Sequence, residues 1–235
     1  MKPVKEILIL TPTPNEHRSV KAHVGRAGFD KIKCTVVECG PGKINAAFKA
    51  AEELSTRRDE DVVLIGAGTA GSLTKELRAG QVIASRAALI SDWRMEDGDE
   101  VKVSPYGWFD YREPAPEQVA KMTLECRDPL MAAFFDRLPS AQWRLGRLLT
   151  SDAFVAGQKR KLELGRIFGC LACDMESGAF GYVAEKLSPR PWANFRVVAD
   201  TLDDALDDYF AMERDMTEIL GRQLVEALNI LDRLL

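Results

Sequence analysis

Histidine is almost missing from this sequence. Its 235 residues include only two histidines, His17 and His23, against 36 aspartates and glutamates. A zinc site built from several histidines is therefore nearly excluded, and we expect no metal and no cofactor. Any acid–base chemistry has to rest mainly on carboxylates. The question that this scarcity leaves is which few of the acidic side chains matter.

Long apolar runs and clusters of basic residues are missing as well. No apolar segment approaches the ~20 residues of a membrane-spanning helix, and the N-terminal segment lacks a signal-peptide pattern. The net charge is −4 without a lysine and arginine cluster, so we expect neither a membrane nor a nucleic-acid partner. Five cysteines, an odd number, indicate a reduced cytoplasmic protein rather than a disulfide scaffold. The pair Cys170 and Cys173 lies in an apolar run with no second pair for zinc, so we expect buried thiols there.

What the sequence does contain is the composition of a folded core, with 46% hydrophobic and 29% charged residues. The length fits one domain over residues 1–235. Short apolar runs alternate with amphipathic segments, which predicts an α/β fold with a mainly parallel, twisted central sheet and helices on both faces. The predicted strands are 6–11, 33–39, 61–65, 80–84, 147–150, 170–175 and 193–199, and the predicted helices are 43–55, 130–138, 159–165, 177–187 and 212–235.

Residues 92–116 have no periodicity and predict a long loop, of a kind that is often functional in compact domains. Aromatic residues and prolines are concentrated in it. Tyr106, Trp108 and Phe109 are candidates there for a lid or an interface, although aromatic side chains in a loop also pack locally.

A glycine-rich segment, Gly66-Ala-Gly68-Thr-Ala-Gly71, follows the predicted strand 61–65 and matches G-x-G-x-x-G. A dinucleotide site needs a full helix next and an acidic residue about 20 positions on, but barely two helical turns fit before the next strand. Two interpretations stay open. The segment is a tight turn whose backbone N–H groups and Thr69 hydroxyl face a small polar ligand, or it is a purely structural glycine turn.

Six segments, in order, resemble motifs of the nucleoside phosphorylase/nucleosidase superfamily, and most closely those of the methylthioadenosine/S-adenosylhomocysteine nucleosidases and the futalosine hydrolases. Together they span about residues 7 to 210. They are ILILTPTPNE, CGPGKINAA, GAGTAGSL with LRAGQVIAS, TSDAFVAG, DMESGAFGYVAEKL and FRVVAD.

The resemblance implies a purine nucleosidase that hydrolyses the N-glycosidic bond of a 5′-modified, adenosine-like nucleoside without a cofactor. Such a reaction needs an acid on the leaving base and a group that activates water on the opposite face of the sugar, as in inverting glycoside hydrolysis. Asp200 would protonate purine nitrogen 7, Glu16 would position the water, and Glu176 would accept the ribose hydroxyls. The remaining substrate contacts implied are Thr69, Phe154, Val155, Met175 and Phe210.

Without the resemblance these residues have ordinary interpretations. Asp200 would cap the following helix, and Glu16 would be a solvated residue in the first turn of a helix, where the dipole favours it. Phe154 and Met175 would fill the core.

Departures from the family motifs bear on the substrate and the nucleophile. Ala199 stands where the family has a serine, and Cys39 and Pro41 stand near the expected 5′ pocket. The phosphorylases carry an arginine at the position of Gly66, so hydrolysis is favoured and a purine nucleoside phosphorylase is the runner-up. A non-catalytic nucleoside-binding or storage protein is the alternative of another class. The family commonly pairs, which implies a homodimer or a higher homo-oligomer.

Overall fold

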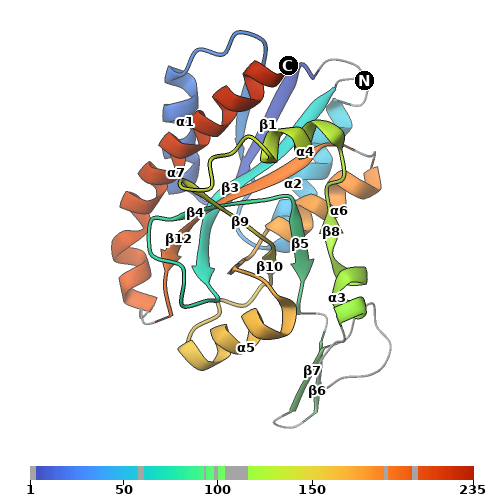
Figure 1. The fold of residues 1–235 in the computed structure, drawn as a ribbon, viewed down its shortest axis with the longest axis vertical. Helices are drawn as coiled ribbons and strands as arrows, with labels where there is room; N and C mark the ends of the chain where they lie inside the picture. The colour runs from blue at the N-terminus through green and yellow to red at the C-terminus, as the bar shows by residue number, and fades with distance from the viewer. Residues whose placement is uncertain are drawn as a thin grey trace.

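The computed structural model describes residues 4–57, 61–92, 94–97, 100–103, 116–187, 190–202 and 206–235. A mixed sheet of ten strands runs through the centre, in the order β8-β5-β10-β11-β3-β12-β4-β9; β1 also pairs with β3, and β2 pairs with β1 (Figure 1). The strands of this sheet are β1 (Glu6–Thr11), β2 (Lys33–Glu38), β3 (Val62–Ser72), β4 (Val82–Ser85), β5 (Ala87–Ile90), β8 (Leu124–Glu125), β9 (Trp143–Leu145), β10 (Leu148–Thr150), β11 (Ala172–Asp174) and β12 (Trp192–Asp200).

Most neighbouring strands run parallel, which confirms the predicted fold class. The parallel pairs include β1 with β2 and β3, and β12 with β3, whereas β12 and β4 are antiparallel. Every residue of β1 and of β12 is buried, as expected for strands that are covered on both faces. The helices are α1 (Pro14–Arg26), α2 (Lys43–Thr56), α3 (Pro116–Met122), α4 (Pro129–Phe135), α5 (Gln158–Phe168), α6 (Ser177–Leu187) and α7 (Leu206–Leu234).

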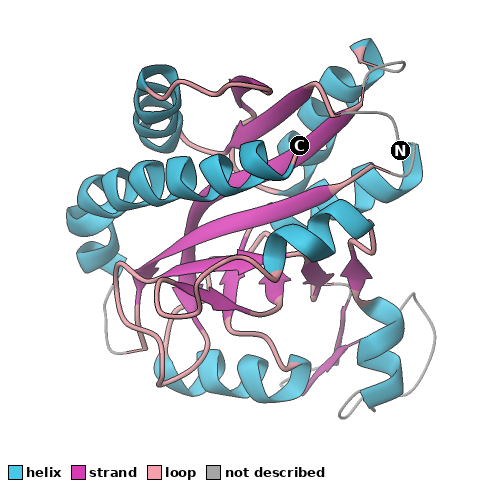
Figure 2. Ribbon diagram, turned by 45° about the horizontal axis from the view of Figure 1, so that its top comes forward, coloured by secondary structure: helices cyan, strands magenta, loops and turns pink. Residues whose placement is uncertain are grey.

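Two helix pairs cover the sheet (Figures 1 and 2). Helices α1 and α7 pack against each other, and α7 lies over β12 and β3. Helices α2 and α6 form the second pair, and α6 contacts β5 and β10. None of the helices in the described ranges is both long enough and apolar enough to span a membrane.

The interpretation of the glycine-rich segment as a turn is wrong. Strand β3 continues through it as far as Ser72. The glycines face polar side chains of the paired strand β12, because Gly66 is in register with Asn194, Gly68 with Arg196, and Gly71 with Asp200.

A β-carbon at any of these glycines would collide with the polar group beside it. It would lie 2.2 Å from Asn194 Oδ1 at position 66, 2.3 Å from Arg196 Nη1 at position 68, and 2.5 Å from Asp200 Oδ1 at position 71. The glycines are therefore there because buried polar side chains approach the strand closely, not because the backbone turns.

Several further segments differ from the prediction, and the sequence patterns did not predict β5, β8, β9 or α3. Part of the expected 92–116 loop forms a hairpin of β6 (Arg94–Asp97) and β7 (Glu100–Val103), while Tyr106, Trp108 and Phe109 lie outside the described residues. Helix α1, which the apolar periodicity does not predict although the interpretation of Glu16 as a first-turn residue implies a helix there, begins at Pro14 with a capping box between Thr13 and Glu16. Proline is well suited to a first helical position, since its missing N–H has no partner there in any case.

Candidate active site

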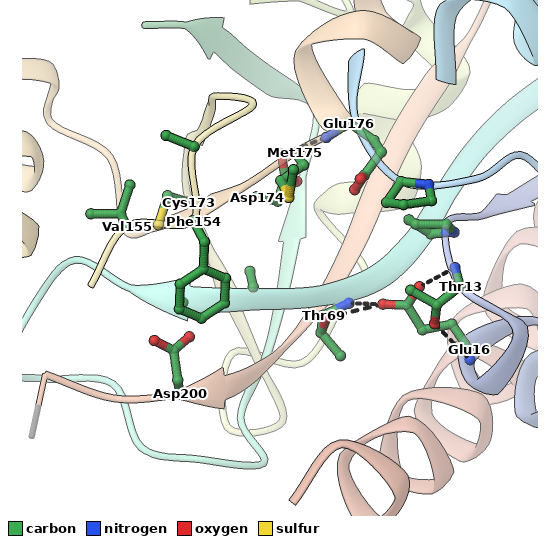
Figure 3. A pocket seen from close by; sticks show the side chains of 15 residues that line it. Thr13, Glu16, Thr69, Phe154, Val155, Cys173, Asp174, Met175, Glu176 and Asp200 are labelled. Carbon is green, nitrogen blue, oxygen red and sulfur yellow. Dashed lines mark hydrogen bonds between the residues drawn. The ribbon is translucent and has the colours of Figure 1, made fainter. Parts of the chain in front are cut away.

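A pocket of about 220 Å³ lies where β1, β3, β11 and β12 end (Figure 3). It collects seven of the eight residues that the resemblance proposes for the site. These seven are Glu16, Thr69, Phe154, Val155, Met175, Glu176 and Asp200. The eighth, Phe210, belongs to α7, and its side chain lies outside the described part of the structure.

Glu16 is deeply buried at one end of this pocket, with 1% of its surface exposed. One carboxylate oxygen, Oε2, accepts the backbone N–H of Thr13 at 2.8 Å. The other, Oε1, accepts the backbone N–H of Thr69 at 2.7 Å and the Thr69 hydroxyl at 3.0 Å. Burial raises the pKa of Glu16, opposed by the charge of Arg196 and by these hydrogen bonds. The interpretation of Glu16 as a solvated first-turn residue is therefore wrong.

Glu176 lies beside a buried guanidinium group. Its Oε2 accepts from Arg196 Nη1 at 3.2 Å, and its Oε1 accepts the backbone N–H of Gly42 at 2.9 Å. Arg196 also pairs with Asp174, at 2.9 Å between Nε and Oδ2. The guanidinium group of Arg196 thus interacts electrostatically with three carboxylates, Glu16, Asp174 and Glu176. Burial first, and then the neighbouring Asp174 and Glu16, raise the pKa of Glu176 to about 8.

This raised pKa predicts a pH-dependent stability. In the unfolded chain Glu176 ionises near 4.5, whereas in the folded protein its pKa is about 8, so the folded state holds a proton that the unfolded state has lost in between. Stability contributed at low pH is therefore lost as the pH rises through this window, by at most ~1.4 kcal/mol per pH unit. We expect Glu176→Gln to flatten the pH dependence of the unfolding free energy, measured by urea titration at pH 5, 6.5 and 8.

A matched control is Glu163→Gln. Glu163 is an exposed carboxylate that pairs with Arg160 rather than with a histidine, so its removal takes away no buried carboxyl group and should leave the slope between pH 5 and pH 8 as it is. The same slope in Glu176→Gln as in the parent protein would contradict the raised pKa.

Asp200 lies at the other end of the pocket, next to the Phe154 ring (Figure 3). It is 4% exposed and is the last residue of β12. Helix α7 begins only at Leu206, so Asp200 is not its cap and that interpretation is wrong. The Nζ of Lys161, from α5, hydrogen-bonds Asp200 Oδ2.

The apolar walls of the pocket include one aromatic side chain, Phe154, and one sulfur-containing side chain, Met175. Phe154 is 45% exposed although it is a large apolar residue, and Met175 is half-buried at the pocket rim. Core filling does not account for Phe154. Of the departures from the family motifs, Pro41 lines the pocket, whereas Cys39 and Ala199 are not among the residues that line it.

The sequence interpretation missed the positive charges. Arg196 and Lys161 are 0% and 1% exposed, and each contacts carboxylates of the site. Both had a signal in the sequence. Arg196 lies inside the apolar run of a buried strand, and Lys161 has the helical spacing of the buried Leu164 and Phe168.

In the described ranges, no group of three or more His, Cys, Asp or Glu side chains is arranged to hold a metal ion. The described site consists of carboxylates, two threonines, Cys173 and an apolar wall, with two buried cations behind the carboxylates.

Comparison with known proteins gives one family and a consistent set of relatives. A family model described as "Phosphorylase superfamily" matches residues 1–235. A 5′-methylthioadenosine/S-adenosylhomocysteine nucleosidase of Exiguobacterium sp. is 25% identical over 209 residues, which cover 88% of this chain and 84% of that protein. One of the same description from Staphylococcus aureus is 23% identical over 196 residues, which cover 82% and 79%.

Solved structures share the fold at lower identity. Futalosine hydrolase of Helicobacter pylori has a TM-score of 0.76 at 18% identity, with 96% of this chain and 98% of that chain covered. The 5′-methylthioadenosine/S-adenosylhomocysteine nucleosidase of the same organism, solved with butyl-thio-DADMe-Immucillin-A, has a TM-score of 0.75 at 17% identity and the same coverage.

Proposed function

The chain belongs to the phosphorylase superfamily, and from this premise we propose that it is a purine nucleosidase, built as one domain over residues 1–235, that hydrolyses the N-glycosidic bond of a 5′-modified nucleoside. The observation that carries the proposal is the separation of two buried carboxylates in one pocket, with Asp200 beside an aromatic ring and Glu16 beside Thr69. Relatives named as nucleosidases for methylthioadenosine and S-adenosylhomocysteine support the reaction class.

The two carboxylates have different roles in this reaction. Asp200 donates a proton to purine nitrogen 7 as the base departs, while Phe154 stacks on the base and Val155 contacts its edge. Glu16, held by Thr69, orients the attacking water and takes its proton, and its raised pKa makes it a better base than a solvated glutamate. Glu176 accepts the ribose hydroxyls, with Met175 against the ring. The contact on the 5′ side that the resemblance implies for Phe210 involves a side chain outside the described part of the structure.

Water is a better nucleophile for this site than phosphate. Of the described residues that line the pocket, none is lysine or arginine, while four are acidic, namely Glu16, Asp174, Glu176 and Asp200. Recognition of a phosphate dianion needs cationic donors. Arg196 pairs with Asp174 and Glu176 through Nε and Nη1 and is not among the residues that line the pocket, so no cationic side chain of the described lining faces a phosphate.

Base release from a panel of nucleosides, with and without phosphate, tests this function. Because relatives are named for them, the panel contains 5′-methylthioadenosine, S-adenosylhomocysteine and futalosine. We expect release at the same rate in phosphate-free buffer. A rate that needs phosphate would identify a phosphorylase, and adenine binding without release from any nucleoside would favour a binding or storage protein. Glu16→Gln is expected to lose hydrolysis and to keep adenine binding.

A homodimer is part of the proposal. Ile44 and Phe48, one helical turn apart on α2, are 81% and 66% exposed, and large apolar side chains left open on one helix face are typical of an interface. Helix α2 directly follows Gly42, the partner of Glu176, so a second copy would border the pocket. Phe48→Glu should shift the mass measured by light scattering from dimer to monomer, and Lys21→Glu, on the exposed side of α1, should not.

We also propose a cytoplasmic location. All five cysteines are unpaired in the structure, which suits a reducing compartment. Neither a membrane nor a nucleic acid is proposed as a partner.

A further inference from the structure

Lys161 is a buried lysine that the proposed reaction has not yet used. It is 1% exposed, and its Nζ donates to Asp200 Oδ2 and, at 2.6 Å, to the carbonyl oxygen of Thr201. Lys159, two residues earlier on α5, is exposed. A lysine that is removed from water needs a compensating negative charge, and Asp200 provides it.

The two ends of the pocket therefore differ in their charge balance. At the ribose end, three carboxylates surround one guanidinium group. At the purine end, one ammonium group faces one carboxylate. An opposite charge at hydrogen-bond distance favours the ionised form of a carboxyl group, so the proton of this pair resides on Lys161 rather than on Asp200.

We propose that Lys161 is a positioning residue for the reaction, and that the Lys161–Asp200 pair, rather than a lone carboxyl group, holds the proton that the departing purine takes up. This inference rests on the proposed nucleosidase function. It adds a residue from α5 to a site otherwise built at the ends of strands and at the start of α1.

Protons and electrons balance over the proposed reaction. When the bond between the anomeric carbon and purine nitrogen 9 breaks, its electron pair goes to the purine. Asp200 gives a proton to nitrogen 7, and Lys161 Nζ gives one to Asp200 Oδ2, which leaves a neutral amine. Water forms the new bond to the anomeric carbon and loses a proton to Glu16. Exchange with solvent returns one proton from Glu16 to Lys161, so nucleoside and water become free base and sugar.

Among the described residues, the ionisable groups that face the pair are few. On β11, the Cys173 thiol interacts with the charges of both Asp200 and Lys161. Burial raises the pKa of this thiol to about 12, so it stays neutral. Asp174 and Glu176 lie at the arginine end, as does Glu16 from α1. Strand β3 contributes only alanine, glycine and threonine to the pocket. Of these described groups, Lys161 and Asp200 are the pair that the pH profile tests.

The pair makes a specific prediction for the pH profile. With Lys161 present, the ion pair supplies the proton that the purine takes up. Without Lys161, Asp200 has to collect that proton from solvent, which is harder as the pH rises because free protons become scarcer. Lys161→Met, which keeps the length of the side chain without its charge, should lower kcat about 10–100-fold at pH 8.5 and less than about 3-fold at pH 5.5. This loss is smaller than the ~10²–10⁴-fold that a general acid contributes, because Asp200 is still in place.

The experiment measures kcat and KM from pH 5 to pH 9 for the parent protein, Lys161→Met and Lys161→Gln, with Lys159→Met as the control on the same helix. Lys161→Gln keeps a donor for Thr201 and Asp200 and serves if the methionine variant does not fold. Activity of the parent protein tests the proposed function separately. If kcat fell by the same factor at every pH, so that the profile ran parallel to that of the parent, the role of Lys161 would be overturned.

Discussion

Asp200→Asn is expected to reduce the rate of base release by about 10²–10⁴-fold, the usual contribution of a general acid. The amide has the size and shape of the carboxyl group and can still hydrogen-bond the base, but it has no acidic proton to give. Asp200 is 4% exposed and lies against Gly71, so solvent is not placed to supply the proton in its stead. The measurement is the single-turnover release of base, followed by absorbance.

The substitution also leaves Lys161 buried opposite a neutral group. Breaking a buried ion pair by removal of one partner typically costs ~3–5 kcal/mol, so the variant should melt at a lower temperature than the parent. The double variant Asp200→Asn with Lys161→Met removes both charges, and we expect it to recover stability without recovering activity. Undiminished base release in Asp200→Asn would remove Asp200 from the mechanism.

Gly68→Ala is expected to disable the site and to destabilise the whole protein. The new β-carbon would lie 2.3 Å from Arg196 Nη1 and 3.0 Å from Glu16 Oε1. Arg196 is 0% exposed and is held by Glu176 and Asp174, so it has no free direction in which to move. Overpacking costs typically 1–3 kcal/mol, and the damaged ion pairs add about as much again. A loss of ~3 kcal/mol lowers Tm by roughly 6–12 °C in a chain of this size.

Gly25→Ala is the matched control for this experiment. Gly25 lies in α1, and a β-carbon there meets no atom within 4 Å. Alanine is the better helix former by about 0.8–1.0 kcal/mol, so this variant should be as stable as the parent or more so. If Gly68→Ala melted like Gly25→Ala, the close approach of Arg196 to β3 would not be the reason for the glycine.

Local patterns were sufficient to predict much of this fold and site. Apolar runs predicted β1, β2 and β12, and motif resemblance predicted the seven pocket residues that the structure describes. The path of β3 through its glycines was missed, because the groups that require those glycines, Asn194 and Arg196, lie more than a hundred residues away in the chain. Local sequence shows where glycine occurs, but the cause is a partner across the sheet.

The missed cations have the same origin. Lys161 follows two other basic residues in the sequence, and only its helical spacing from Leu164 and Phe168 distinguishes it from them. Its burial becomes meaningful only once Asp200 is known to lie within reach. A carboxylate and the cation that neutralises it lie close together in space but can be far apart in the chain. The sequence around either residue therefore does not identify its partner.

The register of β3 with β12 has a consequence for how this site can change over evolutionary time. Positions 66 and 194, 68 and 196, and 71 and 200 form three coupled pairs, in which a side chain on one strand requires its absence on the other. After the loss of Arg196, a β-carbon at position 68 would still lie 3.0 Å from Glu16 Oε1, and at position 66 a β-carbon would meet the Phe180 ring at 2.6 Å whatever replaced Asn194. A glycine of this strand can therefore gain a side chain only after its polar partner and these further neighbours have changed, so the glycine has to be replaced last.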